Sequence, residues 1–399
     1  MGANGLLAEL AGIGRAGDGY TRLAWDPATM ELREWFAGAT TALGLELVED
    51  GNGNQVAWWG WGSDALLLGS HLDSVPVGGP LDGPLGVTSA LAAVAALQAE
   101  GWAPSRPIAV ANFTDEEGGR FGIACLGSRL ATGAIAPATA LALRDADGTT
   151  LAEAMAAQGR DPRAAGVAGW LDEVGQFVEL HVEQGRSLVH DDSAVGVASA
   201  IWPHGRWRFD FCGQGNHAGA TAMPDRHDPM LSYAATVLAA RELALATGQR
   251  ATLGRVLVDP GSTNSIPSRV TAWLDARAAS EPELERLVAG ILDRARAAAE
   301  ADGTTVELRL ESTTGAVRFD EGLRHRLAAL LDAPVLPTGA GHDAGILAAR
   351  LPTAMLFVRN PTGVSHAPEE SATAEDIDAG VAALVAVVKE VAGAPTVRA

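Results

Sequence analysis

Segments with the hydrophobic spacing of helices and of strands alternate along the first third of the chain. Residues 30–44 have apolar side chains at helical spacing, and residues 45–61 predict a hairpin around Gly51–Asn54. A buried strand, an apolar helix and two strands with polar ends are predicted at 64–70, 85–101, 106–122 and 175–186. Because this alternation is typical of an α/β fold, we predict an α/β domain with a mixed sheet.

From about residue 204 the pattern changes to that of a compact α+β module. Strand, helix, two strands, helix and strand are predicted at 205–213, 228–248, 251–259, 268–278, 281–303 and 304–312. This order is typical of a split-βαβ, ferredoxin-like arrangement. A helix, a strand and a closing helix follow at 320–333, 352–358 and 374–393. We therefore predict a discontinuous domain at 1–203 and 317–399, with an inserted domain at 204–316.

Polar side chains gather where the predicted strands of the larger domain end. They are His71, Asp73 and Asp82 in the first cluster, Asp115, Glu116 and Glu117 in "TDEEGG", His181 in "HVEQG", and His366 in the later segment "GVSHAPEE". Ligands in open α/β sheets bind beyond the carboxyl ends of strands, so we expect these side chains to converge.

Imidazoles and carboxylates on rigid elements are the ligands that zinc- and manganese-type ions prefer, and paired ions need a bridging carboxylate. In the HxD pair, Asp73 could hold the tautomer of His71. Of two adjacent acids, one could bind metal while its neighbour acts as a general base. Each residue alone has an ordinary alternative: His71 could cap an element, His181 could be a core histidine, and His366 could close a loop. Their joint occurrence favours a two-metal hydrolytic site.

The composition of the chain limits the kinds of partner that it can bind. The net charge of −20 disfavours nucleic acid, whose binding requires many cationic side chains, and Lys389 is the only lysine, so no polybasic segment could hold a membrane surface. Two distant cysteines favour a reducing, cytoplasmic compartment. No apolar run is long enough to span a bilayer. We expect a protein that is neither exported nor membrane-bound.

With these motifs in this order, from "GSHLDSVPVGG" to "GVSHAPEE", the chain resembles the M20 metallopeptidase superfamily and, within it, the hydantoinase/carbamoylase-type amidases. The resemblance implies two divalent ions, which could be zinc, manganese, cobalt or nickel. By this resemblance, the ligands of one ion would be His71, Asp82 and His181. Those of the other would be Asp82, Glu117 and His366, with Asp82 bridging the two ions. Glu116 would be the general base.

The resemblance also implies that the inserted module is a lid and dimerisation domain. His217 would polarise the scissile carbonyl, and Gln184, Asn264 and Arg277 would contact the substrate's carboxylate, which a planar guanidinium can bind with two hydrogen bonds. From the residues alone, Arg277 could equally pair with an acid of its own domain, and Asn264 could be a turn residue.

The activity implied is hydrolysis of the ureido C–N bond of an N-carbamoyl-L-amino acid or allantoate, with release of ammonia, by a homodimer. An M20 dipeptidase or aminoacylase is the alternative, which His181 disfavours because the exopeptidases generally have a carboxylate there. A non-catalytic, metal-binding homologue is a second alternative, which the presence of Glu116 disfavours. His342 and Asp343 in "GAGHDAG" are expected at a helix start close to the site.

Overall fold

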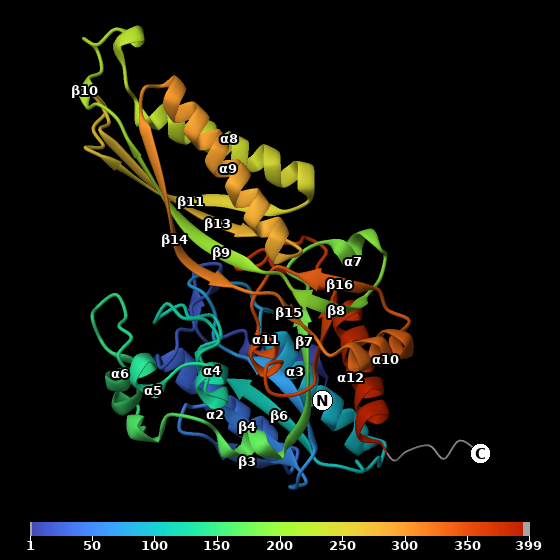
Figure 1. Cartoon of the computed structure of the whole chain (residues 1–399). Helices are drawn as coiled ribbons and strands as arrows, with labels where there is room; N and C mark the ends of the chain where they lie inside the picture. Colours follow the sequence, from blue (N-terminus) through green and yellow to red (C-terminus); the bar gives the residue numbers. More distant parts are fainter. Residues whose placement is uncertain (1, 394–399) are drawn as a thin grey trace. The chain divides into compact units, whose positions relative to one another are not determined.

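The structure, a computed structural model, describes residues 2–393 and divides into two compact units (Figure 1). Unit 1 runs up to Ser199 and resumes at Arg318, and unit 2 comprises Ala200–Val317. None of the described helices combines the length and the hydropathy that a membrane span requires.

Unit 1 is built on a large mixed sheet. Its strands follow the order β15-β8-β17-β7-β5-β6-β4-β3, and β16 pairs with β8. The pairs β5–β6, β5–β7 and β17–β7 are parallel, and β3–β4, β4–β6 and β8–β17 are antiparallel. The bounds are β3 Glu46–Glu49, β4 Gln55–Trp59, β5 Ala65–His71, β6 Ile108–Phe113, β7 Val174–Val182, β8 Val195–Ile201, β15 Val317–Arg318, β16 Val335–Thr338 and β17 Thr353–Val358. The prediction of an α/β fold with a mixed sheet is confirmed.

The central strands are apolar because both faces of the sheet are covered. Every residue of β5, β6 and β17 is buried. Two long helices, α3 (Pro84–Ala99) and α12 (Ala374–Ala392), pack against each other and contribute to the main hydrophobic core with α1 (Ala3–Leu10). The carboxyl ends of β5 and β7 thereby reach a fully buried position beside the start of α3.

The remaining helices and strands of unit 1 are short apart from α2 and α10. They are α2 Pro27–Ala42, α4 Leu126–Thr132, α5 Pro137–Leu141, α6 Leu151–Ala157, α7 Ser187–His190, α10 Glu321–Leu331, α11 Asp343–Leu347, and the small hairpin of β1 Arg15–Ala16 and β2 Gly19–Tyr20. Three 3-10 helices lie at Pro162–Ala164, Gly169–Glu173 and Met223–Asp225, the last in unit 2.

Unit 2 is a four-stranded antiparallel sheet with two helices. The strand order is β11-β13-β9-β14, with bounds β9 His204–Cys212, β11 Arg250–Asp259, β13 Arg269–Arg277 and β14 Thr305–Thr314. The helices α8 (Pro229–Thr247) and α9 (Glu281–Ala301) share a core with alternate residues of these strands. A separate two-stranded sheet joins β10 (Asn216–His217) to β12 (Ser265–Ile266).

The close packing of α3 on the sheet gives a test of the fold. A Cβ added at Gly86 would lie 2.3 Å from the carbonyl oxygen of Leu180. Gly86→Ala should therefore lower the free energy of unfolding by about 1–3 kcal/mol through overpacking, although alanine favours helices. Gly38→Ala in α2 is the control, because nothing lies within 4 Å of a Cβ added there. This change should raise the free energy of unfolding by about 0.5–1 kcal/mol. Urea unfolding measures both, and stabilisation by Gly86→Ala would contradict the close approach of α3 to β7.

Candidate metal centre

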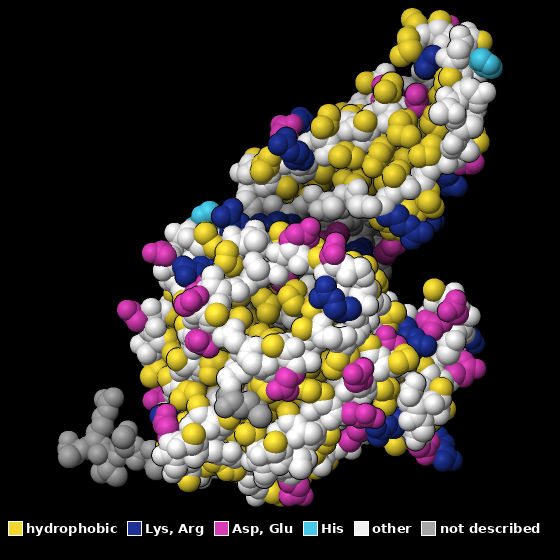
Figure 2. All heavy atoms as spheres, turned by 180° about the vertical axis from the view of Figure 1, so that it is seen from behind, with side chains coloured by type: hydrophobic (Ala, Val, Ile, Leu, Met, Phe, Trp, Pro, Cys, Tyr) yellow, Lys and Arg dark blue, Asp and Glu magenta, His cyan; other side chains and the backbone are white. Residues whose placement is uncertain are grey.

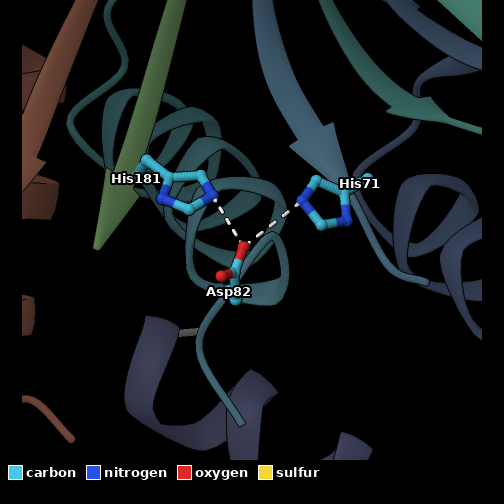
Figure 3. Close-up of side chains that lie close together, drawn as sticks. All are labelled: His71, Asp82 and His181. Atoms are coloured by element: carbon cyan, nitrogen blue, oxygen red, sulfur yellow. Dashed lines mark ion pairs between the residues drawn. The ribbon is translucent and has the colours of Figure 1, made fainter. Parts of the chain in front are cut away.

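Two buried histidine side chains from separate strands converge on one carboxylate oxygen of Asp82 (Figure 3). His71 ends β5, His181 lies in β7, and Asp82 lies on the loop before α3. The Oδ1 atom of Asp82 is 3.1 Å from Nε2 of His181 and 3.6 Å from Nε2 of His71. Both imidazoles are completely buried, and Asp82 is 4% exposed.

The tautomers of the two histidines follow from their backbone contacts. Nδ1 of His71 donates to the carbonyl oxygen of Asp73 at 3.1 Å, and Nδ1 of His181 donates to that of Val182 at 2.9 Å. In the neutral imidazoles the Nε2 lone pairs therefore face the carboxylate, and neither Nε2 has a hydrogen-bond partner within residues 2–393. Three acceptors facing one another repel unless a cation lies between them, so these residues fit a metal ion.

The second oxygen of Asp82 faces a second group of ligands. Its Oδ2 atom is 3.3 Å from Nε2 of His366, which in turn is 3.3 Å from Oε2 of Glu117. The donor atoms of Asp82, Glu117 and His366 all lie within 4.8 Å of one another, as do those of His71, Asp82 and His181. One carboxylate thus offers an oxygen to each of two groups, which is the arrangement that a bridging ligand requires.

The side chain of Asp73 has a different role from the predicted one. Its carboxylate lies 3.5 Å from Nδ1 of His71, farther than the backbone carbonyl that accepts the hydrogen bond. The two carboxylate oxygens instead accept the backbone N–H groups of Glu116 and Glu117, each at 3.1 Å. Asp73 therefore positions the loop that carries both acids.

Glu116 is buried beside the first group of ligands. Its Oε2 atom is 3.7 Å from Nε2 of His71, and its Oε1 atom accepts the thiol of Cys125 at 3.2 Å. Burial raises the pKa of Glu116 well above its usual value, and neighbouring acids add to this against the attraction of His71. Burial likewise raises the pKa of Glu117 to about 7.

The pKa shifts around Asp82 show where positive charge is favoured. Burial lowers the pKa of the imidazoles, but Asp73 and Asp82 raise that of His71 well above normal, and Asp82 raises that of His181 to about 9. Burial raises the pKa of Asp82, yet the surrounding histidines hold it well below its usual value. A divalent cation meets the same demand for positive charge without protonating its ligands.

Gln184 lies at this centre, whereas the other predicted substrate contacts belong to unit 2. The side-chain amide of Gln184 donates to Oδ2 of Asp82 at 2.8 Å. In unit 2, β10 pairs with β12, and the carbonyl oxygen of Asn264 accepts the N–H of Ala218 at 3.0 Å. His217 and Asn264 thus lie together, and both are exposed.

Arg277 lies at the other end of the same unit. It pairs in register with His204, whereas Arg269, at the opposite end of β13, pairs with Cys212 near the loop that leads to His217. The guanidinium of Arg277 donates from Nε to Asp275 at 2.9 Å, so Arg277 does have an acidic partner in its own unit.

Sequence reasoning missed several residues that touch the ligands. Ser365 donates to Oδ2 of Asp82 at 2.9 Å, and Glu370 accepts the N–H of Asp82 at 2.9 Å. Both occur in "GVSHAPEE", but nothing in that segment distinguishes them from ordinary loop residues. His342, expected near the site, precedes α11 and packs with its ring centroid 4.5 Å from that of His181.

Comparisons with known proteins show to which family the chain belongs. Residues 67–390 match the profile of the peptidase family M20/M25/M40. The chain is 37% identical to an N-carbamoyl-L-amino acid amidohydrolase of Geobacillus stearothermophilus over 95% of each chain. It is 31% identical to an allantoate amidohydrolase of Escherichia coli over 94% of this chain and 93% of that one.

A solved structure gives the same result. An amidase of the hydantoinase/carbamoylase family from Burkholderia multivorans superimposes with a TM-score of 0.89 at 30% identity, covering 99% of this chain and 98% of that one. The profile match spans both ligand groups, and the likeness extends over nearly the entire chain. The chain therefore belongs to peptidase family M20/M25/M40 and, within it, to the hydantoinase/carbamoylase amidases.

Proposed function

We propose that this protein is a two-metal amidohydrolase that cleaves the ureido C–N bond of an N-carbamoyl-L-amino acid or a related ureido acid such as allantoate. The observation that carries the proposal is Asp82, whose two oxygens face separate ligand groups while Glu116 lies beside one of them. The similarity to enzymes named for these substrates supports the substrate class. Zinc, manganese, cobalt and nickel all accept such a ligand set.

We propose that Glu116 moves the proton that hydrolysis requires. Divalent ions held by the two ligand groups would lower the pKa of the attacking water and polarise the ureido carbonyl. Glu116 accepts the proton of that water and returns it to the departing nitrogen. Burial, which raises its pKa, brings this carboxyl closer to the range in which a group can both accept and donate near neutral pH.

The contacts of His217 suit a hydrogen-bond donor. Its Nδ1 atom accepts the backbone N–H groups of Gly219 and Ala220, both at 3.1 Å. The proton of the neutral ring is therefore on Nε2. From this position His217 donates to the oxygen on which negative charge develops, and so stabilises it.

A substrate that contacts both His217 and Arg277 needs two protein chains. The two residues lie toward opposite ends of β13, whose length corresponds to roughly 26 Å at about 3.3 Å per residue. A ureido acid only a few bonds long cannot bridge that span within one unit 2. We therefore propose a homodimer in which His217 and Asn264 act in the partner's site.

The surface of α8 offers a place for this dimer contact. Leu231, Leu238 and Leu245 recur every seven residues, so they lie along one face of the helix, and they are 47%, 67% and 68% exposed. In Figure 2, hydrophobic side chains gather over unit 2, with a few acidic and basic side chains at the edges of this region. An apolar stripe of this kind is typical of a helix that packs against a partner.

The two cysteines of the chain form no disulfide: Cys125 is buried and Cys212 is half-buried. Unpaired thiols suit a reducing compartment, so we propose that the enzyme acts in the cytoplasm.

The substrate proposal is tested by measuring ammonia release from N-carbamoyl-L-amino acids and allantoate, and the release of free amino acids from dipeptides. We expect turnover of one or more ureido acids and none of dipeptides. Dipeptide hydrolysis alone would support the dipeptidase alternative, and bound metal without any turnover would support a non-catalytic homologue.

Glu116→Gln removes the proton acceptor but keeps the size of the side chain. We expect kcat to fall about 10²–10⁴-fold, because general-base catalysis contributes a factor of this size, while the metal content stays unchanged. Steady-state kinetics and elemental analysis measure the two quantities. Glu34→Gln, an exposed change on α2, serves as the control. A wild-type rate in Glu116→Gln would contradict the base assignment.

Metal binding should depend on pH. Neighbouring carboxylates raise the pKa of His71 above its usual value and that of His181 to about 9, so the metal-free protein favours the protonated form of these imidazoles. Metal must displace these protons, so its affinity should rise with pH, by about tenfold per unit for each proton released. Calorimetry with Mn²⁺ in buffers of different ionisation enthalpy counts the protons. Binding without proton release would contradict this account.

Complementation between two inactive variants tests the dimer. His217→Ala and Arg277→Ala should each be inactive alone. In mixed dimers one site carries both changes and the other neither, so equimolar mixing with subunit exchange should restore up to about a quarter of wild-type activity. Absence of recovery, with mixed dimers demonstrated by mass spectrometry, would show that both residues serve the same chain's site.

A further inference from the structure

Glu370 links two of the three loops that carry ligands of the second group. Its Oε2 atom accepts the backbone N–H groups of Leu81 and Asp82 at 2.8 and 2.9 Å. Its Oε1 atom lies 3.1 Å from Oγ of Ser365, which precedes His366 and also contacts Oδ2 of Asp82. One side chain therefore joins segments that are almost 290 residues apart in the sequence.

The surroundings of Glu370 show that it is built into this position. The residue is 3% exposed. A Cβ at Gly79 would lie 2.3 Å from its Oε2 atom, so only glycine lets the loop pass this close. Within residues 2–393 no arginine, lysine or histidine forms an ion pair with it. A buried carboxylate is costly without compensating positive charge, and the two metal ions of the proposed centre would supply it.

The two ligand groups depend on this link to different degrees. His71 and His181 belong to strands in the middle of the sheet, and the sheet register fixes them independently of Glu370. His366 lies on a loop, is 49% exposed, and has a left-handed backbone with φ of 57°. In the second group, only Glu117 is held without the help of Glu370, since Asp73 orients it.

We propose that Glu370 is a positioning residue for the second metal, which holds Asp82 and His366 in register with each other. This inference rests on the two-metal centre of the proposed function. Outer carboxylates that orient metal ligands typically contribute 10–100-fold to metal affinity. Loss of Glu370 should act mainly on the ion bound by Asp82, Glu117 and His366.

Titration of the metal-free protein with Mn²⁺ tests the proposal without relying on activity. Wild-type protein should bind two equivalents. Glu370→Ala should bind the first with an affinity within about threefold of wild type and the second about 10–100-fold more weakly. Electron paramagnetic resonance of free Mn²⁺ counts the bound equivalents, and calorimetry gives the affinities.

Two further variants distinguish the loss of the hydrogen bonds made by Glu370 from the loss of a negative charge. Glu370→Gln keeps an oxygen that can accept both N–H groups and an amide that can donate to Ser365, so it should retain most of the second-site affinity. Glu369→Ala removes an exposed neighbouring acid and should bind like wild type.

Unchanged second-site affinity in folded Glu370→Ala would overturn the proposal, and so would an equal loss at both sites. Urea unfolding shows whether the variant is folded. If it is not, Ser365→Ala removes one arm of the same link and should still weaken the second site more than the first. Two metals bound without hydrolysis of any ureido acid would refute the proposed function but not this inference.

Discussion

The centre depends on the demand for positive charge around the buried carboxylate of Asp82. Two imidazoles turn their Nε2 atoms toward one of its oxygens because backbone carbonyls occupy their Nδ1 protons. A third imidazole faces the other oxygen. Such a cluster is tolerated in a buried site only if positive charge is present, and two ions bridged by one carboxylate would supply that charge.

The packing of a few strands and one helix brings the ligands together. Parallel strands β5 and β7 are neighbours, so the histidines at their carboxyl ends lie side by side. The start of α3, packed against the same strands, brings Asp82 to them. Asp73 then fixes the loop of Glu116 and Glu117 through its backbone. Rigid elements thus hold the first group, whereas loops hold much of the second.

Local pattern was sufficient for much of the fold. The strand β5 and the helix α3 could be predicted because an element that is buried on all sides consists almost entirely of apolar residues. Strands β8 and β16 were not predicted, since short segments beside a larger sheet are defined by their pairing partner rather than by their own sequence.

The site was predictable only in part. The ligand candidates stood out as polar residues at the ends of apolar strands, and their family resemblance supplied the grouping. The residues that orient them did not stand out. Glu370 bonds to a loop far away in sequence, and it was a carbonyl, not the expected carboxylate, that set the tautomer of His71. Such choices depend on ångström-scale geometry that no spacing of residue types encodes.

Anomalous X-ray scattering from crystals of the Mn²⁺-loaded protein tests the central claim most directly. The account predicts two peaks, each within bonding distance of a different oxygen of Asp82, one beside His71 and His181 and the other beside Glu117 and His366. A single peak, or two peaks that do not share Asp82, would contradict it.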